Sequence, residues 1–219
     1  MFSSVLRQAL KGVGLEMAAR DFLRERRFRA RMRQVETEWT VRGRPVPPPD
    51  SVKHAVILGM AKRYQAQTLV ETGTFYGDTI FALRNAFREI HSIELAPELF
   101  AHNQRALGHL TQIYLHQGDS ASVLPGLLPR LPGPVVFWLD GHFCAGPSAR
   151  GRGDTPISEE LGAIFARPPA ADVVLIDDAR LFDGTNDYPP LERLRTYCRI
   201  QRPKSEFAVQ DDIIRVAPV

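Results

Sequence analysis

The sequence predicts an α/β fold built on a doubly wound, mostly parallel sheet, and three observations support this prediction. Short apolar runs alternate with amphipathic segments from residue 67 to residue 199, a pattern typical of a parallel sheet with helices on both faces. A hairpin pattern at residues 206–216 adds an antiparallel last strand. Acidic residues end or follow five of the apolar runs. Together these observations predict a seven-stranded sheet with polar groups at its carboxyl edge.

The elements follow one another in a regular order. We expect strands at residues 67–71, 90–94, 112–116, 134–139, 172–177, 206–209 and 212–216. We expect helices at residues 51–65, 79–88, 97–107, 120–128, 157–166 and 189–199. A chain of 219 residues is long enough for one well-packed core and a short extension.

The composition is that of an ordinary soluble globular protein. Apolar residues make up 44% and charged residues 24% of the chain, and no apolar run approaches the ~20 residues of a membrane span. The first thirty residues are rich in arginine and do not resemble a secretory signal. Cys144 and Cys198 lack metal-ligand spacing and predict free thiols in a reducing compartment. We therefore expect a cytoplasmic protein.

Residues 1–50 predict a basic helical extension with a proline-rich linker, and residues 51–219 predict the main domain. The first 47 residues hold eleven basic and five acidic side chains. Apolar residues recur there at helical spacing: Phe2, Val5, Leu6, Leu10, Val13 and Met17. Such a helix can pack on its own domain with a solvated basic face, or residues 1–45 can meet an acidic partner or a membrane surface. No nucleic-acid partner is expected, because no known binding motif is present.

The most informative segment is Val70-Glu-Thr-Gly-Thr-Phe-Tyr-Gly-Asp-Thr79. It predicts a strand, a tight glycine turn and a helix, a geometry that lets backbone approach a ligand. The glycines, Gly73 and Gly77, are four residues apart, so this is not the dinucleotide-binding fingerprint. Glu71 would repel a pyrophosphate and suits ribose hydroxyls or a cationic centre. A purely structural turn is the alternative.

Two further segments complete a nucleoside-binding pattern. Glu94 ends the second predicted strand, about 20 residues after the glycine turn, where an acid grips a ribose in doubly wound folds. Gly118-Asp119-Ser120 follows the third strand. Asp119 can accept a hydrogen bond from an adenine amine, and Ser120 can cap the next helix. A solvated strand end for Glu94, and plain helix capping for Asp119 and Ser120, are the alternatives.

Polar residues after the fourth and fifth strands predict a reaction centre. Asp140 and His142 follow one strand, and Asp177 and Asp178 follow the other. Converging carboxylates raise one another's pKa unless a cation neutralises them, and Mg²⁺, Mn²⁺ or Ca²⁺ suits oxygen ligands. Asp178 can instead pair with Arg180. His142 can act as a general base or hold the loop by a hydrogen bond.

These motifs together resemble the class I S-adenosylmethionine (SAM) methyltransferases, and in particular a bacterial methyltransferase-like family over about residues 52–217. The resemblance implies a Rossmann-like fold. It implies SAM contacts at Glu71, Thr72, Gly73, Thr74, Tyr76, Gly77, Thr79, Glu94, Leu95, Gly118, Asp119, Ser120 and Asp140. It implies a catalytic role for His142 and Asp140.

The chain is also similar to metal-dependent small-molecule O-methyltransferases. That similarity implies Mg²⁺ or Mn²⁺ bound by Asp140, Asp177 and Asp178. The sequence departs from their pattern at Gly141-His142-Phe143, where some of those enzymes continue with a further acid. A metal-free enzyme with a histidine base is therefore the alternative mechanism.

The expected activity is O-methylation of a small hydroxylated acceptor, such as a sugar or a secondary metabolite. Arg150 and Arg152, in a long loop before residue 155, can bind an anionic substrate or remain solvated. One alternative is a SAM-binding interaction module without catalysis. Another is a metal-dependent oxygenase using Asp140 and His142, with His116 as its second histidine. A homo-oligomer is compatible with the sequence.

Overall fold

The computed structural model describes residues 26–27, 30–141, 155–168 and 171–219. The chain forms two compact units, one of residues 1–45 and 49–51 and the other of residues 46–48 and 52–219. The second unit contains the sheet. No described helix is both long enough and apolar enough to cross a membrane.

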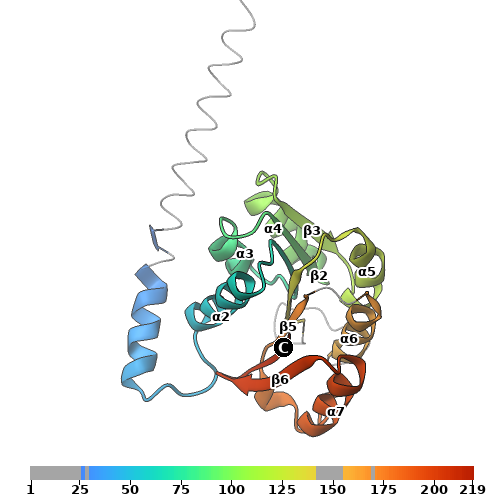
Figure 1. The fold of residues 1–219 in the computed structure, drawn as a ribbon. Coiled ribbons are helices and arrows are strands. Elements are labelled where there is room, and N and C mark those ends of the chain that lie inside the picture. Colours follow the sequence, from blue (N-terminus) through green and yellow to red (C-terminus); the bar gives the residue numbers. More distant parts are fainter. Residues whose placement is uncertain (1–25, 28–29, 142–154, 169–170) are drawn as a thin grey trace, which may run out of the picture. The chain divides into compact units, whose positions relative to one another are not determined.

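The sheet confirms the predicted fold class. Its seven strands lie in the order β3-β2-β1-β4-β5-β7-β6 (Figure 1). The strands are β1 (Thr68–Thr72), β2 (Glu89–Glu94), β3 (Ile113–Gln117), β4 (Val135–Leu139), β5 (Val173–Ile176), β6 (Ser205–Gln210) and β7 (Ile213–Pro218). The first five are parallel, and β7 is antiparallel to both β5 and β6. The strand order reverses between β1 and β4, which brings their carboxyl ends together at the point where such sheets bind ligands.

Helices cover both faces of the sheet (Figure 1). They are α2 (Asp50–Arg63), α3 (Asp78–Leu83), α4 (Pro97–Leu107), α5 (Ser120–Leu127), α6 (Ile157–Ala166) and α7 (Leu191–Gln201). Two short 3₁₀ turns, Leu128–Arg130 and Ala179–Leu181, follow α5 and β5. The predicted helix at 79–88 is wrong at its end, because the chain must turn before β2, where Arg88 donates its N–H to the Gln67 carbonyl at 2.9 Å.

The central strands are buried along their whole length. Every residue of β1, β4 and β5 is buried, as expected for parallel strands covered on both faces. Phe137 and Trp138 of β4 are 0% and 1% exposed, and burial of such a side chain stabilises the fold by about 1.5–3 kcal/mol. This packing fixes the strand ends that carry the candidate site.

The last two strands form a two-residue hairpin at Asp211 and Asp212. These two turn residues have φ angles of 54° and 58°, as in a type I′ turn, whose twist matches that of the flanking strands. Gln210 pairs with Ile213, so the turn lies one residue later than predicted. Asp212 therefore comes close to the start of the 3₁₀ turn after β5, where its carbonyl accepts the Ala179 N–H at 2.8 Å.

The first unit contains a helix with residues 26–27 and 30–41 described. Beyond it, the Trp39 indole N–H donates to the Pro45 carbonyl at 2.6 Å, and the Arg44 guanidinium lies 5.7 Å from the Trp39 ring. The apolar stripe predicted from Phe2 to Met17 falls outside the described residues.

Candidate functional site

The loop after β1 requires glycine at two positions. Gly73 and Gly77 have φ angles of 82° and 76°, in the left-handed region that glycine enters without steric cost. A Cβ on Gly73 would lie 2.4 Å from the backbone oxygen of Asp140, and a Cβ on Gly77 would lie 2.6 Å from Asn103 Oδ1. The loop therefore packs directly against the end of β4 and against α4.

Glu71 lies beneath this loop and is only 2% exposed. The Ser92 hydroxyl donates to Glu71 Oε2 at 2.6 Å, and the Thr74 hydroxyl lies 2.6 Å from Ser92 Oγ. Burial raises the pKa of Glu71 to about 8, although hydrogen bonds from Ser92 and Thr79 oppose the rise. In this arrangement Glu71 holds β1, β2 and the glycine loop together, and the cofactor contact predicted for it stays a prediction.

Glu94, at the end of β2, fixes the same loop from the side. Its Oε2 accepts the Phe75 N–H and its Oε1 accepts the Ala96 N–H, both at 2.8 Å. Asn103 of α4, fully buried, donates to the Phe75 carbonyl at 2.6 Å. Two carboxylate oxygens offer about four acceptor positions. The Glu94 carboxylate therefore fits the predicted ribose role, because its two oxygens can still accept hydrogen bonds from two hydroxyls.

The segment after β3 has a different internal arrangement from the predicted one. The Gly118 N–H donates to the Glu94 carbonyl at 2.9 Å, which joins the ends of β2 and β3. Asp119 is the N-cap of α5, accepting the Ala121 N–H at 3.3 Å. The prediction that Ser120 caps this helix is wrong, because its hydroxyl instead donates to Glu160 Oε1 at 2.6 Å.

Glu160 is a buried carboxyl that the sequence did not reveal as part of the site. It comes from α6 and is 1% exposed. Burial raises its pKa to about 7, while hydrogen bonds from Ser120 and Thr72 oppose the rise. A Cβ on Gly141 would lie 3.1 Å from Thr72 Oγ1 and 3.4 Å from Glu160 Oε1. Glu160 thus lies below the ends of β1 and β4. It appeared in the sequence only as an acid in a helical first turn.

Aromatic rings project from the glycine loop. Phe75 and Tyr76 are 46% and 44% exposed, and their ring centroids are 4.5 Å apart in an edge-on arrangement. The Tyr76 ring also meets His102 of α4 edge-on at 5.6 Å. Leu95 is half-buried, and its carbonyl accepts from the Gln117 side chain at 3.3 Å. The cofactor contacts predicted for Tyr76 and Leu95 stay predictions.

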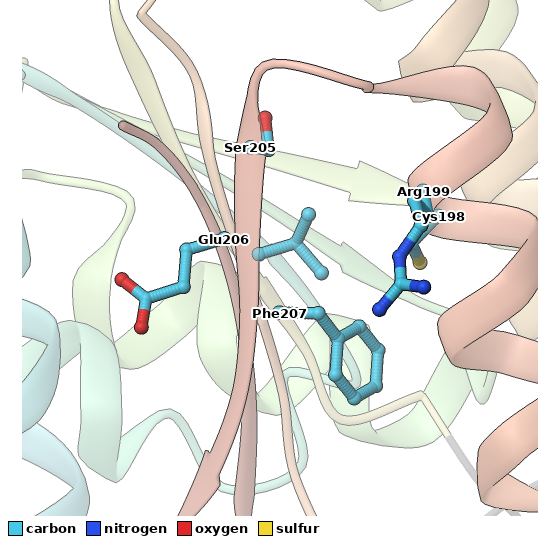
Figure 2. A pocket seen from close by; sticks show the side chains of 6 residues that line it. Cys198, Arg199, Ser205, Glu206 and Phe207 are labelled. Atoms are coloured by element: carbon cyan, nitrogen blue, oxygen red, sulfur yellow. The ribbon is translucent and has the colours of Figure 1, made fainter.

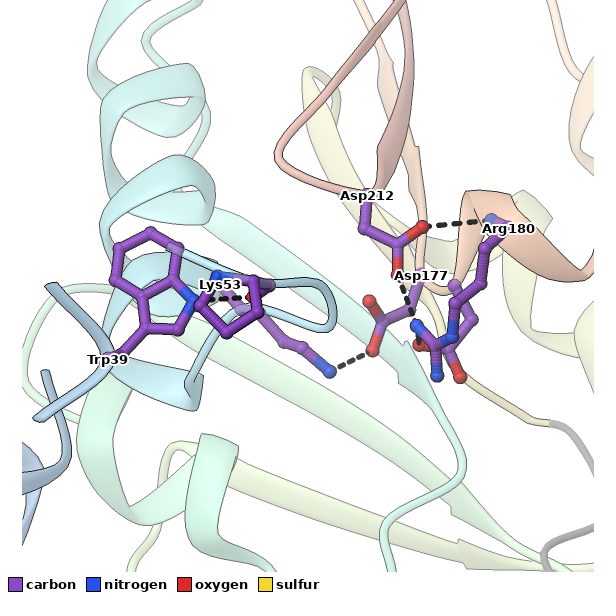
Figure 3. A network of polar contacts seen from close by, with 7 residues as sticks. Trp39, Lys53, Asp177, Arg180 and Asp212 are labelled. Carbon is purple, nitrogen blue, oxygen red and sulfur yellow. Dashed lines mark hydrogen bonds and ion pairs between the residues drawn. The ribbon is translucent and has the colours of Figure 1, made fainter. Parts of the chain in front are cut away.

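Asp140 and Asp177 follow β4 and β5, as predicted. Lys53 reaches Asp177 from α2 (Figure 3). The Lys53 ammonium forms a salt bridge with Asp177 Oδ2. Burial and the neighbouring Asp177 raise the pKa of Asp140 well above its ordinary value, against the effect of Lys53. Burial also raises the pKa of Asp177, although Lys53 opposes it.

Asp178 takes part in a second ion pair. It has a left-handed backbone, with φ 55° and ψ 49°, and its Oδ1 accepts from Arg180 Nη1 at 2.7 Å. The same Nη1 donates to Asp212 Oδ2, and the Arg180 backbone N–H donates to Asp212 Oδ1 at 2.8 Å. The alternative pairing of Asp178 with Arg180 is therefore observed.

The predicted metal ligands do not fit a metal centre in this arrangement. Asp177 is paired with Lys53, and Asp178 with Arg180. Among residues 26–27, 30–141, 155–168 and 171–219, no group of three or more His, Cys, Asp or Glu is arranged to hold a metal ion. His142, the predicted base, and Arg150 and Arg152 lie outside the described residues.

The histidine required for an oxygenase lies elsewhere. His116 is in β3, which is separated from β4 by β2 and β1. Its Nε2 lies 3.1 Å from His91 Nδ1, and His91 stacks on Tyr114 with centroids 4.7 Å apart. His116 and Asp140 therefore cannot share one metal ion, and the alternative of an oxygenase with His116 as its second histidine is wrong.

A hollow of about 250 Å³ lies between α7 and β6. Figure 2 shows Phe207 and Arg199 on one side of β6 and Glu206 on the other. Cys198, whose thiol is buried, also lines it. None of the predicted site residues lines this hollow, so it is separate from the candidate site.

No protein-family model matches the sequence, and a search of curated proteins found no relative. Among solved structures, an O-methyltransferase from Bacillus cereus in complex with S-adenosylhomocysteine (SAH) is similar, with a TM-score of 0.55 and 12% identity. The match covers 85% of this chain and 90% of that one. TomG from Streptomyces achromogenes, an O-methyltransferase of tomaymycin synthesis in complex with SAM, has a TM-score of 0.52 and 19% identity, with 86% and 88% covered.

An SAH-bound methyltransferase from Podospora anserina gives a TM-score of 0.51 and 15% identity, and the match covers 76% of this chain and 78% of that one. At such low identities these similarities establish the fold. The chain has the Rossmann-like fold of the SAM-dependent methyltransferases.

Proposed function

We propose that this protein is a SAM-dependent methyltransferase that methylates an oxygen of a small hydroxylated molecule. One observation carries the proposal: the glycine loop of residues 73–77 and the Glu94 carboxylate lie at the adjacent carboxyl ends of β1 and β2. This is the edge at which doubly wound sheets bind ligands. The similar O-methyltransferase structures, bound to SAM or SAH, support the same cofactor.

The described residues fit a nucleoside better than a pyrophosphate. Glu94 has lone pairs left for ribose hydroxyls after tethering the loop. Asp119 is half-buried beside Gly118 and caps α5. Its remaining acceptor positions can accept a hydrogen bond from an adenine amine. Bound SAM supplies an activated methyl group on a sulfonium sulfur. Phe75 and Tyr76 are exposed on the loop, and we propose that their rings exclude water from the bound cofactor.

Transfer of a methyl group to a hydroxyl requires alignment and removal of one proton. Asp140 follows β4, against the glycine loop, with its backbone oxygen in direct contact with Gly73. The end of β4 therefore adjoins the loop that would hold the methyl donor. We propose that Asp140 orients the acceptor and that His142, two residues further on, takes the proton.

The test is incubation of the purified protein with radiolabelled SAM and a bacterial small-molecule extract. The proposal expects label in a low-molecular-weight product, and loss of that product in Glu94→Gln. Glu98→Gln is the matched control, because Glu98 is an exposed residue of α4 close in sequence to Glu94. SAM binding without methyl transfer to any extract would instead favour the non-catalytic SAM-binding module.

A further inference from the structure

The position predicted for a divalent ion already has two positive charges nearby. Lys53 forms a salt bridge with Asp177, and Arg180 bridges Asp178 and Asp212 (Figure 3). Their combined charge equals that of one divalent cation. Two of the three predicted metal ligands, Asp177 and Asp178, are therefore paired with cations of the chain itself.

Lys53 is specifically placed for this role. It lies 124 residues before Asp177 and reaches it from the first turn of α2. Its side chain is 16% exposed, whereas that of Asp177 is 1% exposed. The salt bridge with the buried Asp177 therefore holds the ammonium of Lys53 at the carboxyl end of β5.

The removal of such a cation has a predictable cost. A buried carboxylate that loses its partner is left with an uncompensated charge, which is strongly destabilising. Carboxylates that lie close together without a countercharge can also bind Mg²⁺ or Mn²⁺ through their oxygens. Loss of Lys53 should therefore both weaken the fold and create an affinity for a divalent ion.

We propose that Lys53 is the fixed cation of the acceptor site and takes the electrostatic place that a divalent metal has in metal-dependent O-methyltransferases. The protein then folds and binds its cofactor without a metal. The assignment of this cluster to an acceptor site rests on the proposed methyltransferase function. The ion pair and its consequence for metal binding do not rest on it.

The experiment compares wild type with Lys53→Met and Lys53→Arg by thermal unfolding in EDTA and in Mn²⁺, and by titration of Mn²⁺ followed by electron paramagnetic resonance. Lys62→Met is the matched control, because Lys62 is exposed on the same helix. SAH binding to the same proteins is measured by calorimetry. A protein that does not bind SAH would contradict the methyltransferase proposal without affecting the test of the ion pair.

We expect wild type, Lys53→Arg and Lys62→Met to bind no Mn²⁺ and to unfold at the same temperature in EDTA and in Mn²⁺. In EDTA, Lys53→Met should unfold on the order of 10 °C lower. It should bind one Mn²⁺ per chain and regain stability with it. The double variant Lys53→Met/Asp177→Asn, which removes both charges, should bind no Mn²⁺.

Stoichiometric Mn²⁺ binding by the wild type, with stability lost in EDTA, would overturn the proposal. So would a Lys53→Met protein that keeps its full stability and gains no Mn²⁺ affinity. If Lys53→Met does not fold, the Mn²⁺ titrations of the wild type and of the double variant decide. Absence of Mn²⁺ binding by both agrees with the proposal, and stoichiometric binding by either contradicts it.

Discussion

Replacing Gly73 by alanine should damage both the fold and the proposed cofactor site. The residue has φ 82°, and its new Cβ would lie 2.4 Å from the oxygen and 2.9 Å from the carbon of the Asp140 carbonyl. The left-handed conformation costs alanine about 1–2 kcal/mol, and the backbone shift needed to relieve the overlap costs about 1–3 kcal/mol. We therefore expect Gly73→Ala to lose about 2–5 kcal/mol of the free energy of unfolding.

Urea denaturation of the wild type and variant measures this loss, with calorimetry of SAH binding beside it. With an m-value of about 2–3 kcal/mol/M, the midpoint should fall by roughly 1–2 M. Gly59→Ala is the control, because a Cβ there meets nothing within 4 Å and the residue lies inside α2. It should gain about 0.5–1 kcal/mol. An unchanged urea midpoint and SAH affinity in Gly73→Ala would refute the close approach of the two strand ends.

Three further outcomes are expected. Glu94→Gln should bind SAH about 10- to 100-fold more weakly by calorimetry, because charge-assisted hydrogen bonds are lost, and equal affinity would remove Glu94 from the ribose site. Since the folded-state pKa of Glu71 is about 8, against an ordinary 4.5, the folded state holds the extra proton between these values. Its contribution to stability therefore falls as pH rises through that window, by up to about 1.4 kcal/mol per unit. Urea unfolding at pH 5–8 should show a weaker pH dependence in Glu71→Gln than in wild type, and identical slopes would contradict the buried environment. Deletion of residues 1–45 should leave the unfolding temperature of the sheet unit within a few degrees of wild type, because every strand among the described residues lies in residues 52–219. A molten product in circular dichroism would show that the extension is part of the core.

The sheet could be predicted from the sequence because its signals are local. Apolar runs bounded by turn residues gave all seven strands to within two residues at each end, and the acids that follow them marked the carboxyl edge. The glycine turn was recognisable for the same reason, since a left-handed backbone at Gly73 depends on that residue and its neighbours.

The partners of the buried acids could not be predicted, because they come from distant helices. Lys53 lies in an unremarkable helical segment, and only the folded chain brings it to Asp177. Glu160 is separated from Ser120 by 40 residues. As a result, the sequence left open whether Asp178 binds a metal or pairs with Arg180, and it offered no cation for Asp177. It also left the α5 cap open between Asp119 and Ser120, and the structure has Asp119 as the N-cap.

The central claim is that this sheet binds SAM at the ends of β1 and β2, and calorimetry of SAH with the metal-free wild-type protein tests it most directly. The account predicts one binding site per chain in about the micromolar range, equivalent to about −8 kcal/mol. The same affinity should be found in EDTA and in Mg²⁺. Absence of SAH binding by the folded protein, or binding of NAD in its place, would contradict the claim.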